Sequence, residues 1–582
     1  MHATSGANGP ERHTDWQRIT WRVANRRVRN LRHRIFRATQ EGEWAKVRSL
    51  QKLMLRSYAN TLVSVRRVTQ VNTGKNTAGV DKVVIKTPHA RGRLVDLLMT
   101  TQPWRAKPAR RVYIPKSSGK LRPLGIPTVL DRRLQARVKN ALEPSWEARF
   151  EGSSYGFRPG RGCPDAIGRI YRLACPHRRK KGVVDADIKG AFDNIDHTRL
   201  LETIGDAPGR ELIKQWLKAG YVDKGVFAET KTGTPQGGVI SPLLANIALH
   251  GMEEALGVTY AKKKDREPVI RGARAVVRYA DDVVVFCESR ADAETVSDIL
   301  TVWLKERGLT LSPEKTRIVH LSEGFDFLGY TVRHHKVTNT RTGWKLLITP
   351  RKKAVQEIRD RLRAEWQALR GHNVAEVCTR LNRIVRGWAN YHRVNVASRV
   401  FHSLDQWMFK KIRRWITRTH PHKSRAWTRQ RYWGYLNPRQ PARLVCGDTR
   451  TGLFLLRFAW FTIKRHTLVQ GTYSPDDPRL RAYWLKRNAA KAKDQTAWKR
   501  SVAHAQEYVC LTCGESLSNG EELQKHHVAP RSAGGRIPTA TSASHTSIAI
   551  KRSQANRPRG RPCSLKSIYP GLTFSGCLSR VR

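Results

Sequence analysis

The sequence predicts an α+β fold in which a mixed middle region is flanked by helical, basic segments. Apolar residues recur at three- and four-residue steps from Val47 to Val68, which is the period of an amphipathic helix. From about residue 110, short apolar runs such as Val183-Val184 and Ala275–Val277 alternate with Gly/Pro turns and helical stretches. After about residue 350, the sequence becomes helical again and strongly basic.

The N-terminal helical segment is predicted to run from about Trp16 to Gln70. The Gly- and Asn-containing segment Asn72–Asp81 is predicted to end it. Its central apolar positions follow the helical period without an intervening Gly or Pro, so we expect an amphipathic helix with a basic outer face. These positions are Val47, Leu50, Met54, Tyr58, Leu62, Val65 and Val68.

The charge balance points to a polyanionic partner. The chain of 582 residues has 109 Lys and Arg against 47 Asp and Glu, a formal net charge of +62. Nucleic acid is the expected partner of a globular chain this basic. Aromatic residues sit among the cations, as in Arg413-Arg414-Trp415, and such pairs can neutralise phosphates and stack on unpaired bases. For any single Trp, packing in the core is the alternative.

The spacing of the cysteines and the length of the apolar runs indicate the cellular compartment of the protein. Most of the nine cysteines are isolated in the sequence and do not form a disulfide framework, so a reducing compartment is expected. No apolar run reaches the roughly 18 residues of a membrane span. The segment Met1–Asp15 lacks the apolar core of a secretory signal. We therefore expect a cytoplasmic protein with no membrane partner.

Two segments concentrate the carboxylates that could carry chemistry. In the first, Tyr279-Ala280-Asp281-Asp282 lies between the apolar runs Ala275–Val277 and Val283–Phe286, which predicts a β-hairpin with two acids at its tip. Adjacent carboxylates repel each other and are tolerated where a divalent cation binds them. Mg²⁺ takes hard oxygen ligands from one or two carboxylates plus substrate phosphates. The alternative is an ordinary polar turn, in which Asp is common.

A third carboxylate is expected from the second segment, Val183–His197. Asp187 ends its apolar strand-like run, where a helix-like stretch begins. If this strand pairs beside the hairpin, Asp187 and Asp281 converge although 94 positions separate them. Two Mg²⁺ ions roughly 4 Å apart on such a cluster can activate a 3′ hydroxyl and stabilise a leaving pyrophosphate. The predicted metal site therefore consists of two Mg²⁺ ions held by Asp187, Asp281 and Asp282.

The hairpin resembles the catalytic hairpin of reverse transcriptases, and six further blocks resemble blocks of that family in the family's order. They are Arg111–Thr128, Ser154–Gly162, Asp185–His197, Gly233–Asn246, Leu309–Thr316 and Phe325–Tyr330. The resemblance covers about residues 16–435 and implies a right-hand polymerase with fingers and palm. It also implies that Asp187, Asp281 and Asp282 are catalytic acids, and that the enzyme uses dNTPs, an RNA template and a DNA primer.

The same resemblance implies four nucleotide-binding residues. Lys116 and Arg122 match fingers residues that contact the incoming triphosphate, a role that suits their charge. They could instead be plain surface cations. Phe192 matches the aromatic residue that blocks a ribose 2′-OH and so selects deoxynucleotides, and its alternative is core packing. Gln236 matches a residue that lines the nucleotide pocket, where neighbouring glycines allow close backbone approach.

Two further regions resemble proteins encoded by group II introns, and retroviral enzymes have neither. Trp16–Asp81 resembles their N-terminal extension, and Leu381–Arg393 resembles their thumb, or maturase, domain. That domain binds intron RNA and promotes its splicing fold, which suits a basic helical face that recognises RNA by shape and phosphates. The candidate RNA-binding residues, some of which could serve packing instead, are Arg386, Trp388, Tyr391 and Arg393.

The C-terminal region resembles the start of an HNH nuclease module, which many intron proteins use to nick target DNA. Cys510 and Cys513 form a C-x-x-C pair and would supply half of a tetrahedral zinc site. The resemblance implies that His526 holds the nuclease metal and that His527 is the general base. No second Cys/His pair follows, so the zinc site is incomplete and nuclease activity is expected to be lost.

A frameshift is one explanation for the broken nuclease pattern. Residues Arg536–Ser553 are rich in Ser, Thr and Ala. One permitted back-translation of this stretch, read two nucleotides on, contains the missing Asn and a Cys-His pair. If the gene permits that second reading, residues 536–582 are a frameshifted tail with no selected fold. Sequencing around codon 536 tests this.

The predicted organisation is a series of six segments. They are a helical RNA-binding N-terminal extension (1–85), fingers and palm (86–345), a thumb/maturase domain (346–470), a basic DNA-binding linker (471–505), a partial HNH-like module (506–535) and the tail (536–582). The predicted function is a polymerase and maturase that supports intron mobility. One alternative is an RNA-binding maturase without polymerase activity. Another is an RNA-templated polymerase from outside introns, against which the maturase-like tract and the nuclease remnant argue.

Overall fold

A computed structural model describes the chain in nine stretches. They are residues 14–99, 104–115, 119, 121–263, 266–438, 444–492, 497–517, 523–527 and 546–550. The chain folds into two units, each built from separated segments: unit 1 comprises residues 1–149, 195–247 and 474–582, and unit 2 comprises 150–194 and 248–473. Among the described residues, no helix is long and apolar enough to cross a bilayer.

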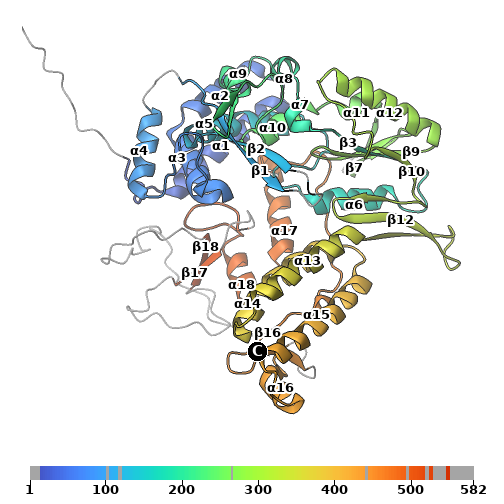
Figure 1. The fold of residues 1–582 in the computed structure, drawn as a ribbon. Coiled ribbons are helices and arrows are strands. Elements are labelled where there is room, and N and C mark those ends of the chain that lie inside the picture. Colours follow the sequence, from blue (N-terminus) through green and yellow to red (C-terminus); the bar gives the residue numbers. More distant parts are fainter. Residues whose placement is uncertain are drawn as a thin grey trace, which may run out of the picture. The chain divides into compact units, whose positions relative to one another are not determined.

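Unit 1 begins with a layer of helices packed on α5 (Figure 1). The helices of this layer are α1 (Trp21–Gln40), α2 (Trp44–Arg56), α3 (Tyr58–Arg66) and α5 (Val129–Glu147). Their apolar faces form one core whose members include Val28, Met54 and Val65. Burial of this shared face is the main force that holds such amphipathic helices in place.

The single amphipathic helix expected over residues 16–70 is in fact three α-helices followed by a π-helical turn, η1 (Arg67–Val71). Gly42 adopts φ +72° between the first two helices, a conformation that glycine takes without strain. Ser57 then starts α3, because its side chain accepts a hydrogen bond from the Asn60 amide at 3.3 Å. The helical period was therefore predicted correctly, and the breaks within it were not.

A four-stranded sheet with the order β2-β1-β4-β5 completes the middle of unit 1. β1 and β2 form an antiparallel hairpin, and β1 pairs in parallel with β4. The strands are β1 (Ala109–Pro115), β2 (Leu121–Ile126), β4 (Tyr221–Asp223) and β5 (Val226–Ala228). The remaining elements of this part are η2 (Thr73–Asn76), α4 (Pro88–Met99), α8 (His197–Ile204), α9 (Arg210–Lys218) and α10 (Ser241–Ala248), whose last residue belongs to unit 2.

The last segment of unit 1, which begins at Ser474, contacts the first helices of the same unit. Arg32 on α1 forms a bidentate salt bridge with Asp476 at 2.7 and 2.8 Å and also contacts Glu143 on α5 at 2.9 Å. All three side chains are nearly inaccessible to solvent. Burial opposes ionisation of Glu143, yet nearby cations, Arg32 among them, hold its pKa down at about 2. The elements of this segment are η4 (Pro478–Leu480), α17 (Arg481–Ala492), α18 (Ala497–Ala505), β17 (Leu523–His527) and β18 (Thr546–Ile550).

The centre of unit 2 is a four-stranded antiparallel sheet with the order β10-β3-β9-β8. Its strands are β3 (Gly182–Asp187), β8 (Ala275–Tyr279), β9 (Asp282–Cys287) and β10 (Arg317–His320). Helix α12 (Arg290–Lys305) packs against β3 and β9 (Figure 1). Helix α6 (Cys163–Leu173) packs against β8. After Asp282, the residues of β9 are all apolar and buried, because helices cover the sheet.

A second sheet and a group of helices complete unit 2. The sheet has the order β11-β12-β13, from β11 (Phe325–Phe327), β12 (Tyr330–Lys336) and β13 (Trp344–Pro350). Three long helices then bury Leu362, Leu381 and Leu404 in one core. They are α13 (Lys352–Ala368), α14 (Val374–His392) and α15 (Ser398–Thr419), and they are followed by α16 (Arg425–Tyr432). The remaining elements are α7 (Ala191–Asn194), α11 (Met252–Ala255), β6 (Tyr260–Lys263), β7 (Arg266–Ile270), β14 (Trp433–Gly434), β15 (Val445–Asp448), β16 (Leu453–Phe454) and η3 (Phe458–Trp460).

Candidate active site

The predicted two-acid hairpin is present in unit 2. β8 and β9 pair antiparallel up to Tyr279 and Asp282, so the turn consists of Ala280 and Asp281. Ala280 has φ +59°, a left-handed conformation that is uncommon for a residue with a side chain. Buried valines on both strands, such as Val277 and Val284, anchor the hairpin in the core and fix the position of its tip.

The predicted pairing of the third acid is confirmed. β3 pairs antiparallel with β9, and Asp187 is the direct partner of Asp282 across the two strands. Directly opposite residues of neighbouring strands have Cβ atoms roughly 4.5–5.5 Å apart and project from the same face. Asp185, two positions earlier on β3, projects from that face as well. The fold therefore brings acids from two segments that are far apart in the sequence to the same end of the central strands β3 and β9.

The pKa values of two of these acids are raised, in part because the carboxylates lie close together. Burial, followed by the neighbouring carboxylates of Asp281, Asp187 and Asp185, raises the pKa of Asp282 to about 7. Burial also raises the pKa of Asp185 to about 6. Two cations lie directly against the cluster: the Lys315 ammonium donates to Asp187 Oδ2 at 2.7 Å, and the Arg317 guanidinium donates to Asp185 Oδ2 at 3.5 Å. No sequence pattern marks Lys315 as a site residue, although it lies in the block Leu309–Thr316 that resembles a reverse transcriptase block.

The donor set of this cluster suits a hard divalent cation. Carboxylate oxygens that are partly exposed and close enough to repel one another are the ligands Mg²⁺ prefers. Within the described part of the chain, no three side chains of His, Cys, Asp or Glu are already arranged as a complete metal site. Mg²⁺ needs only one or two protein carboxylates when substrate phosphates supply further ligands, so the acids present fit the ion.

The segment before β3 supports the hairpin from behind. The Tyr155 amide donates to the Arg278 carbonyl at 2.9 Å, and the Arg278 amide donates to the Ser153 carbonyl at 3.0 Å. Gly156 then lies directly against the turn, where a Cβ atom would be 2.4 Å from the backbone nitrogen of Ala280. The block Ser154–Gly162 was recognised by resemblance, but its packing on the hairpin was not predicted.

The predicted nucleotide-binding residues fall in both units. Phe192 lies on α7 in unit 2, half-buried, with its ring edge-on to Phe157 at 6.0 Å between centroids. Arg122 is exposed on β2 of unit 1. Gln236 is in unit 1 too, and its carbonyl accepts a hydrogen bond from the Gly125 amide at 3.0 Å. Lys116 lies outside the described residues. The roles of these four residues stay predictions.

The candidate RNA-binding residues differ in their surroundings. Arg386 is exposed on α14. Trp388 packs against His392 with 4.2 Å between ring centroids, and Tyr391 stacks on Tyr330 at 5.5 Å. The Arg393 guanidinium donates to the Thr462 carbonyl at 3.0 Å. Trp388 and Tyr391 thus contribute to packing, as the alternative allowed, and contact with RNA stays a prediction for all four candidates.

The C-x-x-C segment folds onto α1 within unit 1. Cys510 and Cys513 are buried, and the Gly514 amide donates to the Cys510 carbonyl at 2.7 Å, which closes the turn. The Asn25 side chain donates to the Cys513 carbonyl at 2.7 Å. The backbone of His526 and His527 lies in β17, which pairs with β18, whereas their side chains lie outside the described residues. β18 falls within residues 536–582, the tail that a frameshift would produce. The other residues of this tail lie outside the described part.

Three family models match the chain. The model of the reverse transcriptase (RNA-dependent DNA polymerase) matches residues 114–332. The model of the N-terminal domain of reverse transcriptase matches residues 16–98. The model of the group II intron maturase-specific domain matches residues 353–433. The first match confirms the predicted right-hand polymerase fold of mixed helices and sheets. Together the matches imply nucleic-acid partners and, for the polymerase domain, use of a divalent metal.

Curated proteins and solved structures show similarity of different extents. Protein YkfC of Escherichia coli (strain K12) is 38% identical over 306 residues, which cover 46% of this chain and 79% of YkfC. The group II intron-encoded protein LtrA of Lactococcus lactis subsp. cremoris is 35% identical over 284 residues, which cover 39% of this chain and 47% of LtrA. A telomerase structure from Candida tropicalis is 15% identical over 39% of this chain and 53% of that chain, with a TM-score of 0.29 that adds nothing to the assignment.

The order of the three matched domains is the one expected from the sequence, and an RNA-directed DNA polymerase domain lies at its centre. The chain therefore belongs to the family of group II intron-encoded reverse transcriptases that carry a maturase domain.

Proposed function

We propose that the protein synthesises DNA on an RNA template from a DNA primer, and that it binds the RNA of its own group II intron to assist splicing. The observation that carries the polymerase proposal is the pairing of Asp187 with Asp282 beside the hairpin turn. Negative charge develops on both the attacking and the leaving oxygen in nucleotidyl transfer, so the reaction needs divalent cations beside them, and an anionic cluster of this kind can hold such cations.

In this proposal the acids at the sheet edge hold two Mg²⁺ ions. When bound, the ions lower the charge on the reacting oxygens and orient the triphosphate. Asp187, Asp281 and Asp282 position them, because the β-ladder fixes the first and third acids opposite each other. The rigid, valine-rich strands keep the acids in place during catalysis, since misplacement by about 1 Å can cost a hundredfold in rate.

Four other side chains would select and hold the nucleotide. Lys116 and Arg122 bind the triphosphate of the incoming dNTP through charge-assisted hydrogen bonds. Phe192 excludes a ribose 2′-OH and so favours deoxynucleotides, and Gln236 lines the nucleotide pocket. The exposure of Arg122 and the half-buried position of Phe192 leave both accessible to a ligand.

The helical region from α13 to α16 would bind intron RNA. Its long helices form their own core, so their polar faces are available for binding. Arg386 is the strongest of the candidate contacts because its guanidinium is exposed and makes no ion pair with any described residue. The net charge of +62 supports an extensive phosphate contact with both intron RNA and target DNA.

We also propose that the nuclease activity of the C-terminal module is lost and that mobility does not depend on cleavage by this protein. No second Cys/His pair follows Cys510 and Cys513 in the sequence, and these two residues lie in the core of unit 1. A two-ligand zinc site is unstable, and a structural zinc ion needs four ligands. Nicking of target DNA by the purified protein with Mg²⁺ would contradict this part of the proposal.

Primer extension tests the polymerase directly. The full chain is incubated with an RNA template, a DNA primer, dNTPs and Mg²⁺, and compared with Asp281→Ala and with Asp298→Ala. Asp298 is an exposed acid on α12 with no hydrogen bond or ion pair to a described residue, so its variant controls for the loss of one negative charge. We expect extension to fall by at least about a hundredfold in Asp281→Ala, on the scale of removing one transition-state stabilising group, and to persist in Asp298→Ala.

Two outcomes would contradict the proposal in different ways. Equal extension by Asp281→Ala and wild type would show that the hairpin is not the metal site. No extension by a folded wild type that still binds intron RNA would favour the RNA-binding maturase without polymerase activity.

A further inference from the structure

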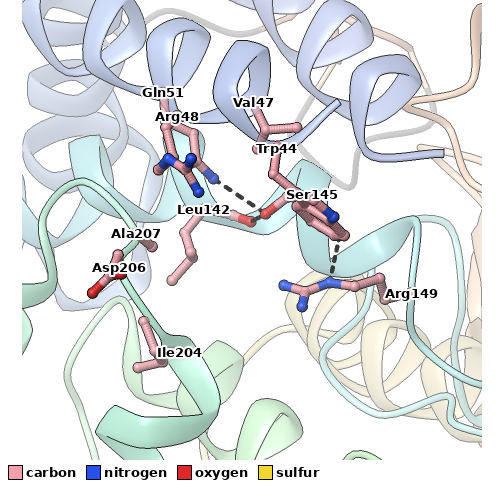
Figure 2. Close-up of a pocket in the computed structure, with 10 residues that line it drawn as sticks. All are labelled: Trp44, Val47, Arg48, Gln51, Leu142, Ser145, Arg149, Ile204, Asp206 and Ala207. Carbon is pink, nitrogen blue, oxygen red and sulfur yellow. Dashed lines mark hydrogen bonds between the residues drawn. The ribbon is translucent and has the colours of Figure 1, made fainter. Parts of the chain in front are cut away.

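Unit 1 contains a small cavity that none of the proposed functions uses. It has a volume of about 130 Å³ and lies between α2, the end of α5 and the connection from α8 to α9 (Figure 2). Drug-sized ligands occupy pockets of roughly 300–1,000 Å³, so this cavity suits a much smaller group, such as one planar ring system. Its lining includes Trp44, Arg48, Gln51, Ser145, Arg149 and Asp206.

One wall of the cavity is a flat aromatic and cationic surface. The Arg149 guanidinium lies 3.6 Å from the ring centroid of Trp146 and 5.6 Å from that of Trp44. Its Nε donates to the Ser145 carbonyl at 3.3 Å, which fixes the plane of the group. Trp44 is 47% exposed, a large fraction for an indole. A planar π-system can stack on the exposed face of Trp44, with the Arg149 guanidinium beside it.

The interior of the cavity carries an incompletely paired amide. Gln51 is only 3% exposed and donates through Nε2 to Ser145 Oγ at 3.2 Å (Figure 2). Its amide oxygen has no hydrogen-bond partner among the residues that the structure describes. This oxygen is open to the cavity, so a ligand that donates a hydrogen bond can take the place of water there. Nucleobases carry such donors beside an aromatic face.

A basic stripe runs along α2 away from the cavity. Arg48, Lys52 and Arg56 are spaced four residues apart, so they share one face of the helix at intervals of roughly 6 Å. All three are exposed, and none forms an ion pair with a described residue. Asp206 lies on the other side of the cavity from Trp44 and disfavours a phosphate there (Figure 2). The charges therefore favour a ligand whose aromatic part enters the cavity and whose phosphates follow α2.

We infer that this cavity binds one unpaired nucleotide of an RNA strand, with its base stacked on the exposed face of Trp44 beside Arg149 and its backbone along the basic stripe. The inference rests on the proposed binding of RNA and adds a site for a single extruded base. An acidic peptide could pair with the three cations of the basic stripe, but its carboxylates provide no ring system to stack on Trp44. Double-stranded RNA would offer phosphates without an available base face.

Photo-crosslinking to a single-stranded RNA tests the site. The full chain, previously saturated with a primer–template duplex, is incubated with a hexamer of RNA that carries 4-thiouridine, irradiated, and mapped by mass spectrometry. We expect labelling of the peptide around Trp44. Affinity for the unmodified hexamer should fall about five- to a hundredfold in Trp44→Ala, because base stacking on an aromatic residue contributes roughly this much. Leu53→Ala is the matched control, since Leu53 is 49% exposed on the same helix and does not line the cavity.

Three results would overturn the inference. They are unchanged affinity in a folded Trp44→Ala protein, crosslinks that map only outside unit 1, and an abasic hexamer or an acidic peptide that binds as tightly as the RNA. Failure of the proposed polymerase is distinguishable, because Asp281→Ala should lose extension while it keeps the hexamer. Conversely, Trp44→Ala with normal hexamer binding and normal extension would remove this site and leave the polymerase proposal intact.

Discussion

The close approach of Gly156 to the hairpin turn predicts that a single methyl group there disables synthesis. In Gly156→Ala, the new Cβ would lie 2.4 Å from the nitrogen of Ala280, 3.0 Å from the carbonyl carbon of Tyr279 and 3.1 Å from the Cα of Ala280. All three atoms are backbone, so no side chain can rotate away. Restoring ordinary contact, which begins at 3.4 Å, requires a shift of about 1 Å in a turn that carries a candidate catalytic acid.

A displacement of about 1 Å can cost roughly a hundredfold in rate, and overpacking of this kind costs typically 1–3 kcal/mol of stability. We therefore expect extension by Gly156→Ala to fall about a hundredfold in a single-turnover assay, with a melting temperature lowered by several degrees. Gly387→Ala is the control, because a Cβ there meets no atom within 4 Å and alanine is favoured in a helix. Wild-type extension and melting by Gly156→Ala would refute the reasoning.

Two further predictions concern buried and exposed charge. Arg32→Ala leaves the carboxylates of Glu143 and Asp476 buried without their shared cation, so thermal or urea unfolding should show a loss of about 3–5 kcal/mol in unit 1. Stability within 1 kcal/mol of wild type would contradict this estimate. Lys315→Ala removes the ammonium group that competes with Mg²⁺ for Asp187, so the Mg²⁺ concentration for half-maximal extension should fall about two- to fivefold, the scale of an exposed ion pair. An unchanged or higher Mg²⁺ requirement would show that Lys315 does not compete.

The local features of the palm could be predicted from the sequence because short-range patterns determine them. The apolar runs on either side of Tyr279–Asp282 predicted both strands of the hairpin, and the strands observed differ from those runs by only one or two residues. The run ending at Asp187 predicted β3, and its pairing with β9 followed from the chemistry, since three acids that share a metal must converge. Function thus supplied a long-range constraint that periodicity alone does not contain.

Other features depend on partners that lie far away in the sequence. The contact of Lys315 with Asp187 joins residues 128 positions apart, and that of Asn25 with Cys513 joins residues 488 apart. No local pattern marks these pairs. They follow from the way the segments pack, which is also why the cavity beside Trp44 had no signature in the sequence.

Unit 1 is built from three segments that are far apart in the sequence, so it can fold completely only after the last of them has been synthesised. Its first helices share a core with Val502, Ala503 and Leu517, which leave the ribosome more than 400 residues after α1. During that interval, part of the apolar face of α1 has no permanent partner, and unit 2 can be synthesised in full before unit 1 is complete. A nascent chain in this state exposes a basic, apolar helix to the transcript from which it is being translated, which would allow the first encounter with RNA to precede the end of folding.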